Sequence, residues 1–293
     1  MNMRKIIKHY KTLIFLFLAS QHPAYANSFA DIEAGLVSDD NLTRTDYSDD
    51  IKADSALELF ADYGNFYELN NNWSATSSVF ARLTNYSKYS QFSSVNYGIA
   101  GSARKKLGLG AYSPSIKITA SASINNVQDD NRDSTLYDIG VGWDKRLNNR
   151  WQLGLGIKYD RSNAKTSTYD TEATTYYLVA DYEINNTLLL NMGISQRNGD
   201  IISITNPTKN PSENIYNYLS KASGNKTSSD TVFGSGLTAY NINANTLILT
   251  VGLSYALDNN SSINARYENQ NSSLPYGISY GNNIYRINYI YSF

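Results

Sequence analysis

The sequence contains no cysteine and only two histidines in 293 residues. The absence of cysteine excludes a disulfide framework, thiolate metal sites, a cysteine nucleophile and a lipid-modified amino-terminal cysteine. Long apolar runs are missing too. After the first 30 residues no stretch is apolar over 18 positions, so no transmembrane helix is expected. Neither a phosphate-binding glycine motif nor a basic patch for nucleic acid is evident, so we expect no nucleic-acid partner.

The amino-terminal segment, residues 1–26, has the pattern of a secretory signal peptide. Four basic side chains precede a short apolar core at Leu13–Leu18, and the small residues Ala24 and Ala26 mark a cleavage site. This pattern predicts cleavage after Ala26 and export of residues 27–293. The alternative is an amino-terminal membrane anchor, which is disfavoured because the apolar core is short and no stop-transfer segment follows.

Removal of this segment changes both the charge and the chemistry. It holds four of the 25 basic residues and none of the 26 acidic ones, so the formal charge falls from −1 to −5. It also holds His9 and His22, which leaves no histidine in residues 27–293. A Ser-His-Asp triad and histidine/cysteine zinc sites are thereby excluded, and we expect neither an enzyme nor a cofactor. Asp181 and Glu183 leave general acid–base catalysis open, but a solvated pair of charges is the simpler interpretation.

From Ser28 onward, apolar and polar residues alternate in short runs separated by clusters of Asn, Asp, Ser and Gly. A period of two predicts β-strands whose two faces differ in polarity. We expect twelve strands, at about 29–37, 56–67, 73–86, 92–104, 115–125, 135–145, 151–161, 174–184, from 187 onward, 246–257, 261–269 and 283–293. The sequence therefore predicts an all-β domain over residues 27–293.

The expected connections alternate in length. Tight turns are expected at residues 70–72, 147–149, 185–186 and 258–260, and long loops at about 38–55, 126–134, 162–173, 197–245 and 270–282. This alternation is typical of antiparallel up-and-down transmembrane β-barrels, in which the short turns face the periplasm. Aromatic residues near strand ends suit the two membrane interfaces: Trp73, Trp151, Tyr159, Tyr182, Tyr255 and Tyr267. The alternative, a secreted β-sandwich, requires neither feature and leaves two exposed strand edges.

The chain ends in a strand pattern, Tyr285–Phe293, with apolar residues at every second position and a final phenylalanine. This pattern resembles the terminal strand of Gram-negative outer-membrane β-barrel proteins. The resemblance implies a location in the bacterial outer membrane and contact with outer-membrane lipid and lipopolysaccharide. It also implies recognition by the barrel assembly machinery, with Tyr289, Tyr291 and Phe293 as the assembly signal. In size the chain is similar to oligosaccharide porins and nucleoside channels, although it lacks the arginine-rich lining of the former.

If the apolar residues face lipid, the alternate set faces the barrel interior. The charged residues expected there are Asp31, Glu33, Glu58, Asp62, Arg82, Arg104, Lys117, Asp138, Asp144, Lys158, Asp160, Asp181, Glu183, Arg266, Glu268 and Arg286. Ten are acidic and six are basic. Either they line a water-filled pore with a weak cation preference, or opposite charges pair across a narrow interior and nearly plug it.

Four glycines, Gly140, Gly142, Gly154 and Gly156, also fall on the interior face. They either leave an open path along that wall or relieve strand curvature. The long segment 197–245 is compatible with two structures. Its apolar stretches at 201–204 and 232–242 predict strand extensions, or an extra hairpin that would raise the count to fourteen strands. The segment could fold into the barrel or project outward.

Acidic pairs in the expected loops, at 39–40, 49–50 and 129–130, could bind calcium or cation-bridged lipopolysaccharide. Solvated acidic loops are the simpler interpretation.

The function that we predict is a porin-like channel for passive diffusion of small hydrophilic solutes through a narrow charged lumen. The alternative is a non-conducting surface barrel whose outer loops serve adhesion or structure.

Overall fold

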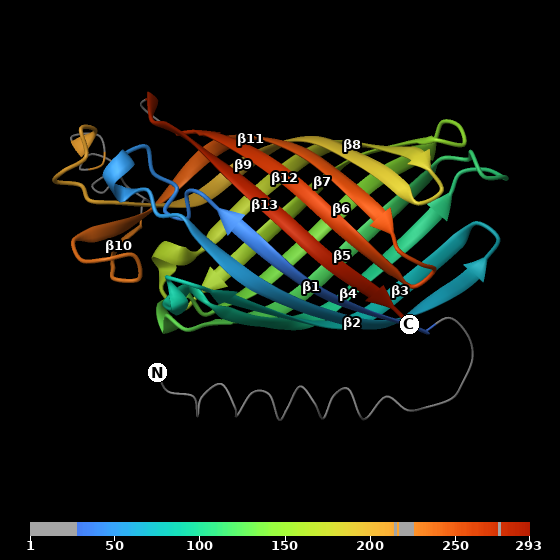
Figure 1. Ribbon diagram of the computed structural model, residues 1–293, viewed down its shortest axis with the longest axis horizontal. Coiled ribbons are helices and arrows are strands. Elements are labelled where there is room, and N and C mark those ends of the chain that lie inside the picture. The colour runs from blue at the N-terminus through green and yellow to red at the C-terminus, as the bar shows by residue number, and fades with distance from the viewer. Residues whose placement is uncertain (1–27, 214–215, 217–225, 275–276) are drawn as a thin grey trace.

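The computed structural model describes residues 28–213, 216, 226–274 and 277–293. The predicted signal peptide, with Ala24 and Ala26, lies outside the described residues. The described chain forms one long barrel with its strands inclined to the barrel axis (Figure 1). No described helix is long and apolar enough to cross a membrane.

Antiparallel pairing of neighbouring strands builds the barrel. The strands are β1 (Ser28–Asp39), β2 (Asp54–Asn70), β3 (Trp73–Tyr86), β4 (Ser94–Lys106), β5 (Ser115–Val127), β6 (Ser134–Arg146), β7 (Trp151–Ala164), β8 (Thr171–Asn185), β9 (Leu188–Thr205), β10 (Thr227–Asp230), β11 (Leu237–Ala256), β12 (Ser261–Ser273) and β13 (Ser279–Ser292). The ring closes because β1 pairs with β13 and β9 pairs with β11. Of the described strands, only the four-residue β10 lies outside the ring, where it pairs with the end of β11.

Twelve strands therefore close the barrel, and the predicted all-β up-and-down fold is confirmed. The alternative of fourteen spanning strands is wrong for the described chain. Residues 201–204 and 237–242 extend β9 and β11, and the two extensions pair with each other from Ile201↔Ile242 to Thr205↔Thr238. Closure satisfies the backbone donors and acceptors of the edge strands, which a bilayer interior requires.

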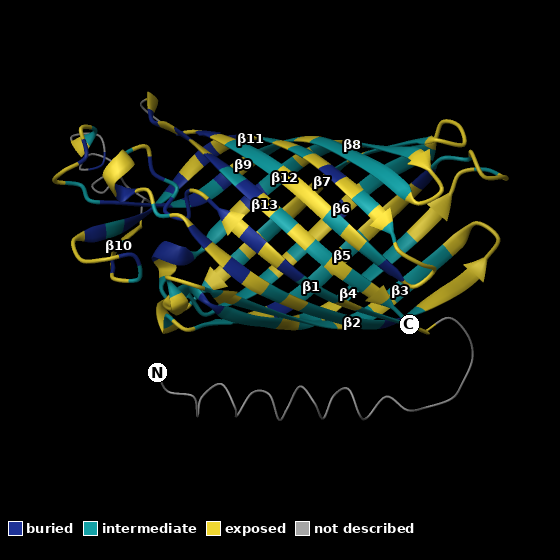
Figure 2. Cartoon of the chain, in the orientation of Figure 1, coloured by how far each residue is buried: buried dark blue, intermediate teal, exposed yellow. Residues whose placement is uncertain are grey.

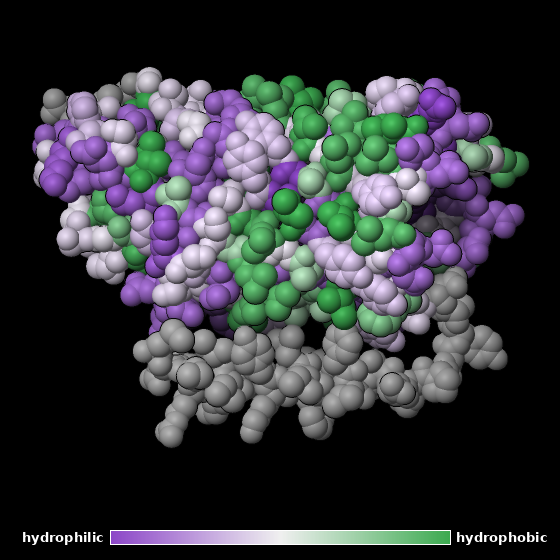
Figure 3. Space-filling model, viewed as in Figure 1, coloured by the Kyte–Doolittle hydropathy of each residue, from purple (hydrophilic) through white to green (hydrophobic). Residues whose placement is uncertain are grey.

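The barrel exterior is apolar and exposed. Leu36 and Ile99, both mid-strand, are each 62% exposed, and exposed and less exposed residues alternate along each strand (Figure 2). A band of hydrophobic residues crosses the middle of the barrel, with hydrophilic residues gathered toward both ends (Figure 3). An apolar surface of this extent suits lipid and would be unstable in water.

The two ends of the barrel differ, as the connection lengths predicted. At the turn end, one side-chain oxygen closes each tight turn by accepting the N–H groups two and three residues later: Asn70, Asn148, Asn185 and Asp258. The Asn260 N–H also holds the pKa of Asp258 below its ordinary value. A longer connection at 107–114, which the pattern did not predict, shares this end. The chain end lies here too, since the Phe293 N–H donates to the Ala30 carbonyl.

Aromatic side chains lie on the exterior at the turn end of the barrel. The rings of Trp151 and Tyr182 lie 4.7 Å apart on neighbouring strands, and the Lys105 ammonium lies 5.2 Å from the Trp73 ring. Rings with a polar edge are favoured at the level of lipid headgroups, so these positions agree with a membrane boundary.

The loop end carries the other connections, four of which contain a short 3-10 helix: η1 (Ser48–Asp50), η2 (Ser90–Phe92), η3 (Asp130–Arg132) and η4 (Ser167–Tyr169). The paired extensions of β9 and β11 also lie here, and both of their faces are buried. Ile204 and Ala239 pack in one cluster with Phe233, whereas Ile242 and Tyr240 pack in another. The loop end thus has a hydrophobic core of its own, unlike the membrane-spanning strands.

Candidate functional site

The structure places all sixteen predicted interior charges on the membrane-spanning strands. Along each strand they occupy the positions that alternate with the exposed apolar residues. Glu58, for example, lies between Leu57 and Leu59, which are 44% and 41% exposed. The direction of these side chains follows from strand alternation. Their part in solute passage stays a prediction.

Opposite charges meet along the interior. Separate ion pairs join Arg104 to Asp144, Lys158 to Asp138 (3.6 Å), Arg197 to Asp160 (3.3 Å), Arg286 to Glu58 (3.5 Å) and Arg266 to Glu268 (2.9 Å). Arg197 is absent from the predicted set because it lies in the segment that the pattern left open. The pairs lie along the barrel wall, within a strand or between nearby strands, and do not bridge its full width.

Like charges also face each other directly across adjacent strands. The strand register sets opposite each other the pairs Asp31↔Asp62, Arg104↔Lys117, Asp138↔Asp160 and Arg266↔Arg286. Directly opposed like charges destabilise a sheet unless water or a counter-charge screens them. The ion pairs named above supply a counter-charge to three of these opposed pairs. Among the described residues neither Asp31 nor Asp62 has an ion-pair partner, so this opposed pair of carboxylates favours water beside it.

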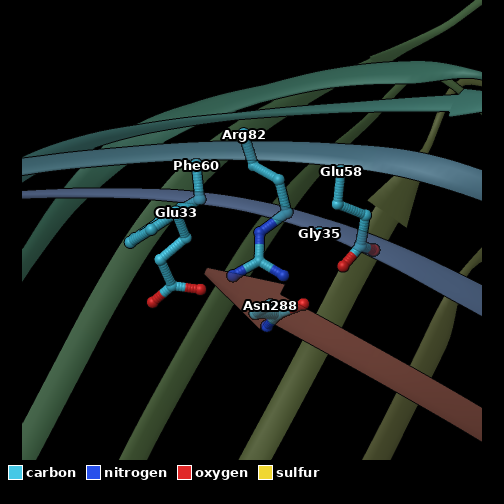
Figure 4. A pocket seen from close by; sticks show the side chains of 6 residues that line it. All are labelled: Glu33, Gly35, Glu58, Phe60, Arg82 and Asn288. Carbon is cyan, nitrogen blue, oxygen red and sulfur yellow. The ribbon is translucent and has the colours of Figure 1, made fainter. Parts of the chain in front are cut away.

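A close-up of one wall shows how the charges are held (Figure 4). Arg82 points between the carboxylates of Glu33 and Glu58, and its guanidinium lies 4.9 Å from the centre of the Phe60 ring. Gly35 leaves room for the neighbouring strand, because a Cβ there would lie 2.0 Å from Oδ1 of Asn288. A small recess opens between these six residues.

The interior glycines on β6 and β7 do not leave the open path that was one expectation. The Tyr177 hydroxyl lies where a side chain would start, 2.7 Å from a Cβ built on Gly142 and 2.4 Å from one built on Gly156. A Cβ on Gly154 would lie 3.0 Å from Val179. Gly142, Gly154 and Gly156 therefore accommodate side chains of β8 against the wall, whereas Gly140 lies against Thr119 of β5. Tyr177 narrows the interior there.

A larger cavity, which we call the chamber, lies toward the loop end and has a volume of about 370 Å³. Its lining residues are Glu58, Thr84, Tyr86, Phe92, Ser94, Asn125, Val127, Arg132, Ser134, Leu136, Ser162, Tyr169, Thr171 and Ile202. Glu58 also lines the recess beside Arg82, so the two spaces adjoin.

Arg132, on η3, anchors the loops beside the chamber. Its guanidinium pairs with the carboxylate of Asp230, which ends β10, and with Asp129 at 3.2 Å. The Arg132 side chain is 9% exposed and that of Asp230 is fully buried. Asp230 also accepts a hydrogen bond from the Tyr169 hydroxyl at 3.0 Å. Burial raises the pKa of Tyr169 first of all, and the neighbouring carboxylates of Asp230 and Asp129 raise it further, against the opposing effect of Arg132.

Aromatic rings surround the same guanidinium. It lies 4.2 Å from the centre of the Tyr169 ring, 5.1 Å from that of Phe92 and 6.0 Å from that of Phe233. Phe233 also contacts Tyr89, with ring centres 4.9 Å apart. Tyr89 and Phe92 lie between β3 and β4, and Phe233 lies between β10 and β11. In the order of strands around the ring, β11 is on the side opposite to β3 and β4. This part of the long segment therefore crosses the barrel mouth, and we call Phe92, Arg132, Tyr169, Asp230 and Phe233 the roof.

The acidic loop pairs act as structural acceptors. Asp39 accepts the Asn41 N–H at 2.9 Å, and Asp50 accepts the Thr205 hydroxyl at 2.7 Å. Asp129 accepts the Asn131 N–H. Within the part of the chain that the structure describes, no group of three or more His, Cys, Asp or Glu side chains is arranged to hold a metal ion. Asp181 and Glu183, the two carboxylates that left acid–base catalysis open, lie on β8, and Asp181 accepts a hydrogen bond from the Asn191 side-chain amide at 2.8 Å.

Comparison with protein-family models and with curated proteins gives no match. Among solved structures, an outer membrane channel from Pseudomonas putida F1 superposes with a TM-score of 0.59 and 10% sequence identity, over 94% of this chain and 98% of that one. The KdgM porin, in complex with disordered oligogalacturonate, superposes with a TM-score of 0.41 and 11% sequence identity, over 90% of this chain and 99% of that one. The NanC porin superposes with a TM-score of 0.43 and 11% sequence identity, over 89% of this chain and 98% of that one.

The likeness to the Pseudomonas putida channel shows a shared fold across almost the whole of both chains. That shared fold is a closed antiparallel β-barrel, and the exposed apolar band on its exterior suits contact with lipid.

Proposed function

We propose that the protein is a porin-like channel for passive diffusion of small hydrophilic solutes across the outer membrane. The observation that carries the proposal is the chamber of about 370 Å³, lined by both polar and apolar residues, inside a barrel with charged walls. Twelve strands enclose more space than eight, whose side chains fill the interior. The opposed carboxylates of Asp31 and Asp62 favour water inside.

The interior charges support a weak preference for cations. Ten of the sixteen predicted interior charges are acidic, and Arg197 adds only one further cation. Glu33, Glu58 and Arg82 lie together at the recess (Figure 4), where a solute would pass close to all three. A net negative lining raises the local concentration of cations and lowers that of anions.

The roof favours a second candidate, a non-conducting surface barrel. Buried groups from loops on opposite sides of the ring cross the mouth, as a rigid adhesion surface would require. The proposed partners differ accordingly: small solutes for the channel, and an external ligand of the loops for the surface barrel. Both share outer-membrane lipid, lipopolysaccharide and the assembly machinery, with Tyr289, Tyr291 and Phe293 as the assembly signal.

A liposome swelling assay separates the two. Liposomes containing the refolded barrel are diluted into iso-osmotic solutions of neutral solutes of increasing size. The channel predicts swelling rates that fall steeply with solute size. Rates equal to those of protein-free liposomes for every solute would support the surface barrel. A shift of the gel band on boiling verifies that the barrel is folded in both cases.

A further inference from the structure

Six neutral hydrogen-bonding side chains near the loop ends of their strands line the chamber. They come one each from six consecutive strands, β3 to β8: Thr84, Ser94, Asn125, Ser134, Ser162 and Thr171. The strand register sets them directly opposite one another in three pairs, Thr84↔Ser94, Asn125↔Ser134 and Ser162↔Thr171. We call this row the polar arc.

The polar arc is not used by the protein itself. Across the described residues, none of its six side chains makes a side-chain hydrogen bond. Other interior polar groups do bond to each other, for example Thr76 to Ser102 at 2.8 Å and Asn96 to Ser123 at 3.0 Å. Each hydroxyl can donate and accept, and the amide of Asn125 can do both as well.

The charged groups of the chamber are engaged elsewhere. Arg132 pairs with Asp129 and Asp230, and Glu58 pairs with Arg286. A charged ligand would have to compete with these pairs, whereas a neutral ligand would leave them intact. The chamber therefore offers neutral hydrogen-bonding groups and no free charge for a ligand of opposite sign.

An apolar surface completes the chamber. The rings of Tyr86 and Phe92 line it with their centres 5.2 Å apart, beside Val127 and Leu136. A sugar ring presents C–H groups on its face, which pack on an aromatic ring, and hydroxyl groups on its edge, which hydrogen-bond. At about 370 Å³ the chamber is more than twice the size of a cavity of roughly 150 Å³ that holds one benzene molecule, so it has room for a small sugar.

We propose that the chamber binds a neutral polyhydroxylated solute of mono- to disaccharide size, held by the polar arc and stacked on Tyr86 and Phe92. This inference rests on the proposed channel function, because the solute has to reach the chamber from the mouth. It names the class of solute that the channel slows and selects.

Titration calorimetry of the full barrel in detergent micelles tests the site. Maltose is the neutral probe and digalacturonate is the acidic one. The triple variant Thr84→Val, Ser134→Ala, Thr171→Val removes one hydroxyl from each pair, and Thr119→Val is the matched control on the interior face of β5, outside the chamber. We expect maltose to bind more tightly than digalacturonate, about 100-fold weaker binding in the triple variant and no change in the control, since each hydrogen bond contributes about fivefold.

Three outcomes overturn the inference: no heat from maltose with the native barrel, tighter binding of digalacturonate, or equal maltose binding by the native barrel and the triple variant. Boiling-dependent gel migration verifies that each variant is folded. Swelling of liposomes is measured in parallel. If neutral solutes permeate and maltose does not bind, the inference fails and the channel stands. If nothing permeates, the channel fails whatever the calorimetry shows.

Discussion

The guanidinium of Arg132 and the buried carboxylate of Asp230 meet across the barrel mouth, although 98 residues separate them in the chain. One side chain belongs to the connection between β5 and β6, and the other ends the short strand that follows β9. The pair ties the long segment to the opposite loops and so contributes to holding the roof over the mouth.

Removal of Arg132 is expected to loosen the roof. The Arg132→Ala change leaves the carboxylate of Asp230 buried without its cation, which costs about 3–5 kcal/mol, whereas the double change Arg132→Ala, Asp230→Asn costs less because no charge is stranded. The readout is trypsin cleavage after Lys226 in the folded barrel. We expect Arg132→Ala to be cleaved fastest, the double variant at an intermediate rate and the exposed control Arg161→Ala like the native protein. Equal rates in all four would show that the pair does not hold the segment.

Tyr177 and the interior glycines give a steric prediction. A Gly142→Ala change places its methyl 2.7 Å from the Tyr177 hydroxyl but 3.9 Å from Cζ of the same ring. We therefore expect Gly142→Ala to destabilise the barrel by about 1–3 kcal/mol with Tyr177 present and to be nearly neutral in a Tyr177→Phe background. Urea unfolding in micelles measures the difference.

Gly193→Ala is the matched control for this pair, since its nearest atoms, on Thr250 and Val179, lie at 3.6 Å. A Gly142→Ala penalty that persists in the Tyr177→Phe background would mean that the hydroxyl does not occupy this space.

The recess beside Arg82 gives a prediction for ion selectivity. Replacing Glu33 and Glu58 by glutamine removes two interior carboxylates and leaves Arg82 and Arg286 unbalanced. The reversal potential in a salt gradient is expected to move toward anion preference. Asp49→Asn, an exposed change on η1, is expected to leave it nearly unchanged. An equal shift from Asp49→Asn would assign selectivity to the loops instead.

Alkaline pH is expected to act on the roof through Tyr169. Because burial raises its pKa above the ordinary value of about 10, the roof is most stable below pH 10 and loses that stability as the pH rises through the raised pKa. Phenolate absorbance, followed together with trypsin cleavage after Lys226, is expected to show a late step that is smaller in Tyr169→Phe. An unchanged late step in that variant would assign it to other tyrosines.

The sequence predicts those features of the structure that depend on residues close together in the chain. A period of two is local, so the twelve strands and the interior face of Glu58 could be predicted from single runs. The tight turns could be predicted as well, because Asn70 and Asn148 each close a turn within three residues.

The roof and the polar arc could not be predicted. Arg132 looks like any loop arginine until the barrel closes and brings it to Asp230. Thr84 and Ser94 resemble ordinary polar residues at strand ends until the register sets them opposite each other and the closed barrel brings them to the same chamber as the polar residues of the next four strands. The filling of the glycine positions by Tyr177 likewise depends on contacts across three strands.

The proposed channel requires that water and small solutes pass through this barrel, and single-channel recording measures that passage. The refolded barrel is added to a planar lipid bilayer, and current is recorded across voltage and pH. We predict stepwise conductance, larger in Arg132→Ala than in the native protein. A silent bilayer under all conditions, with barrel shown to be folded and inserted, would contradict the channel.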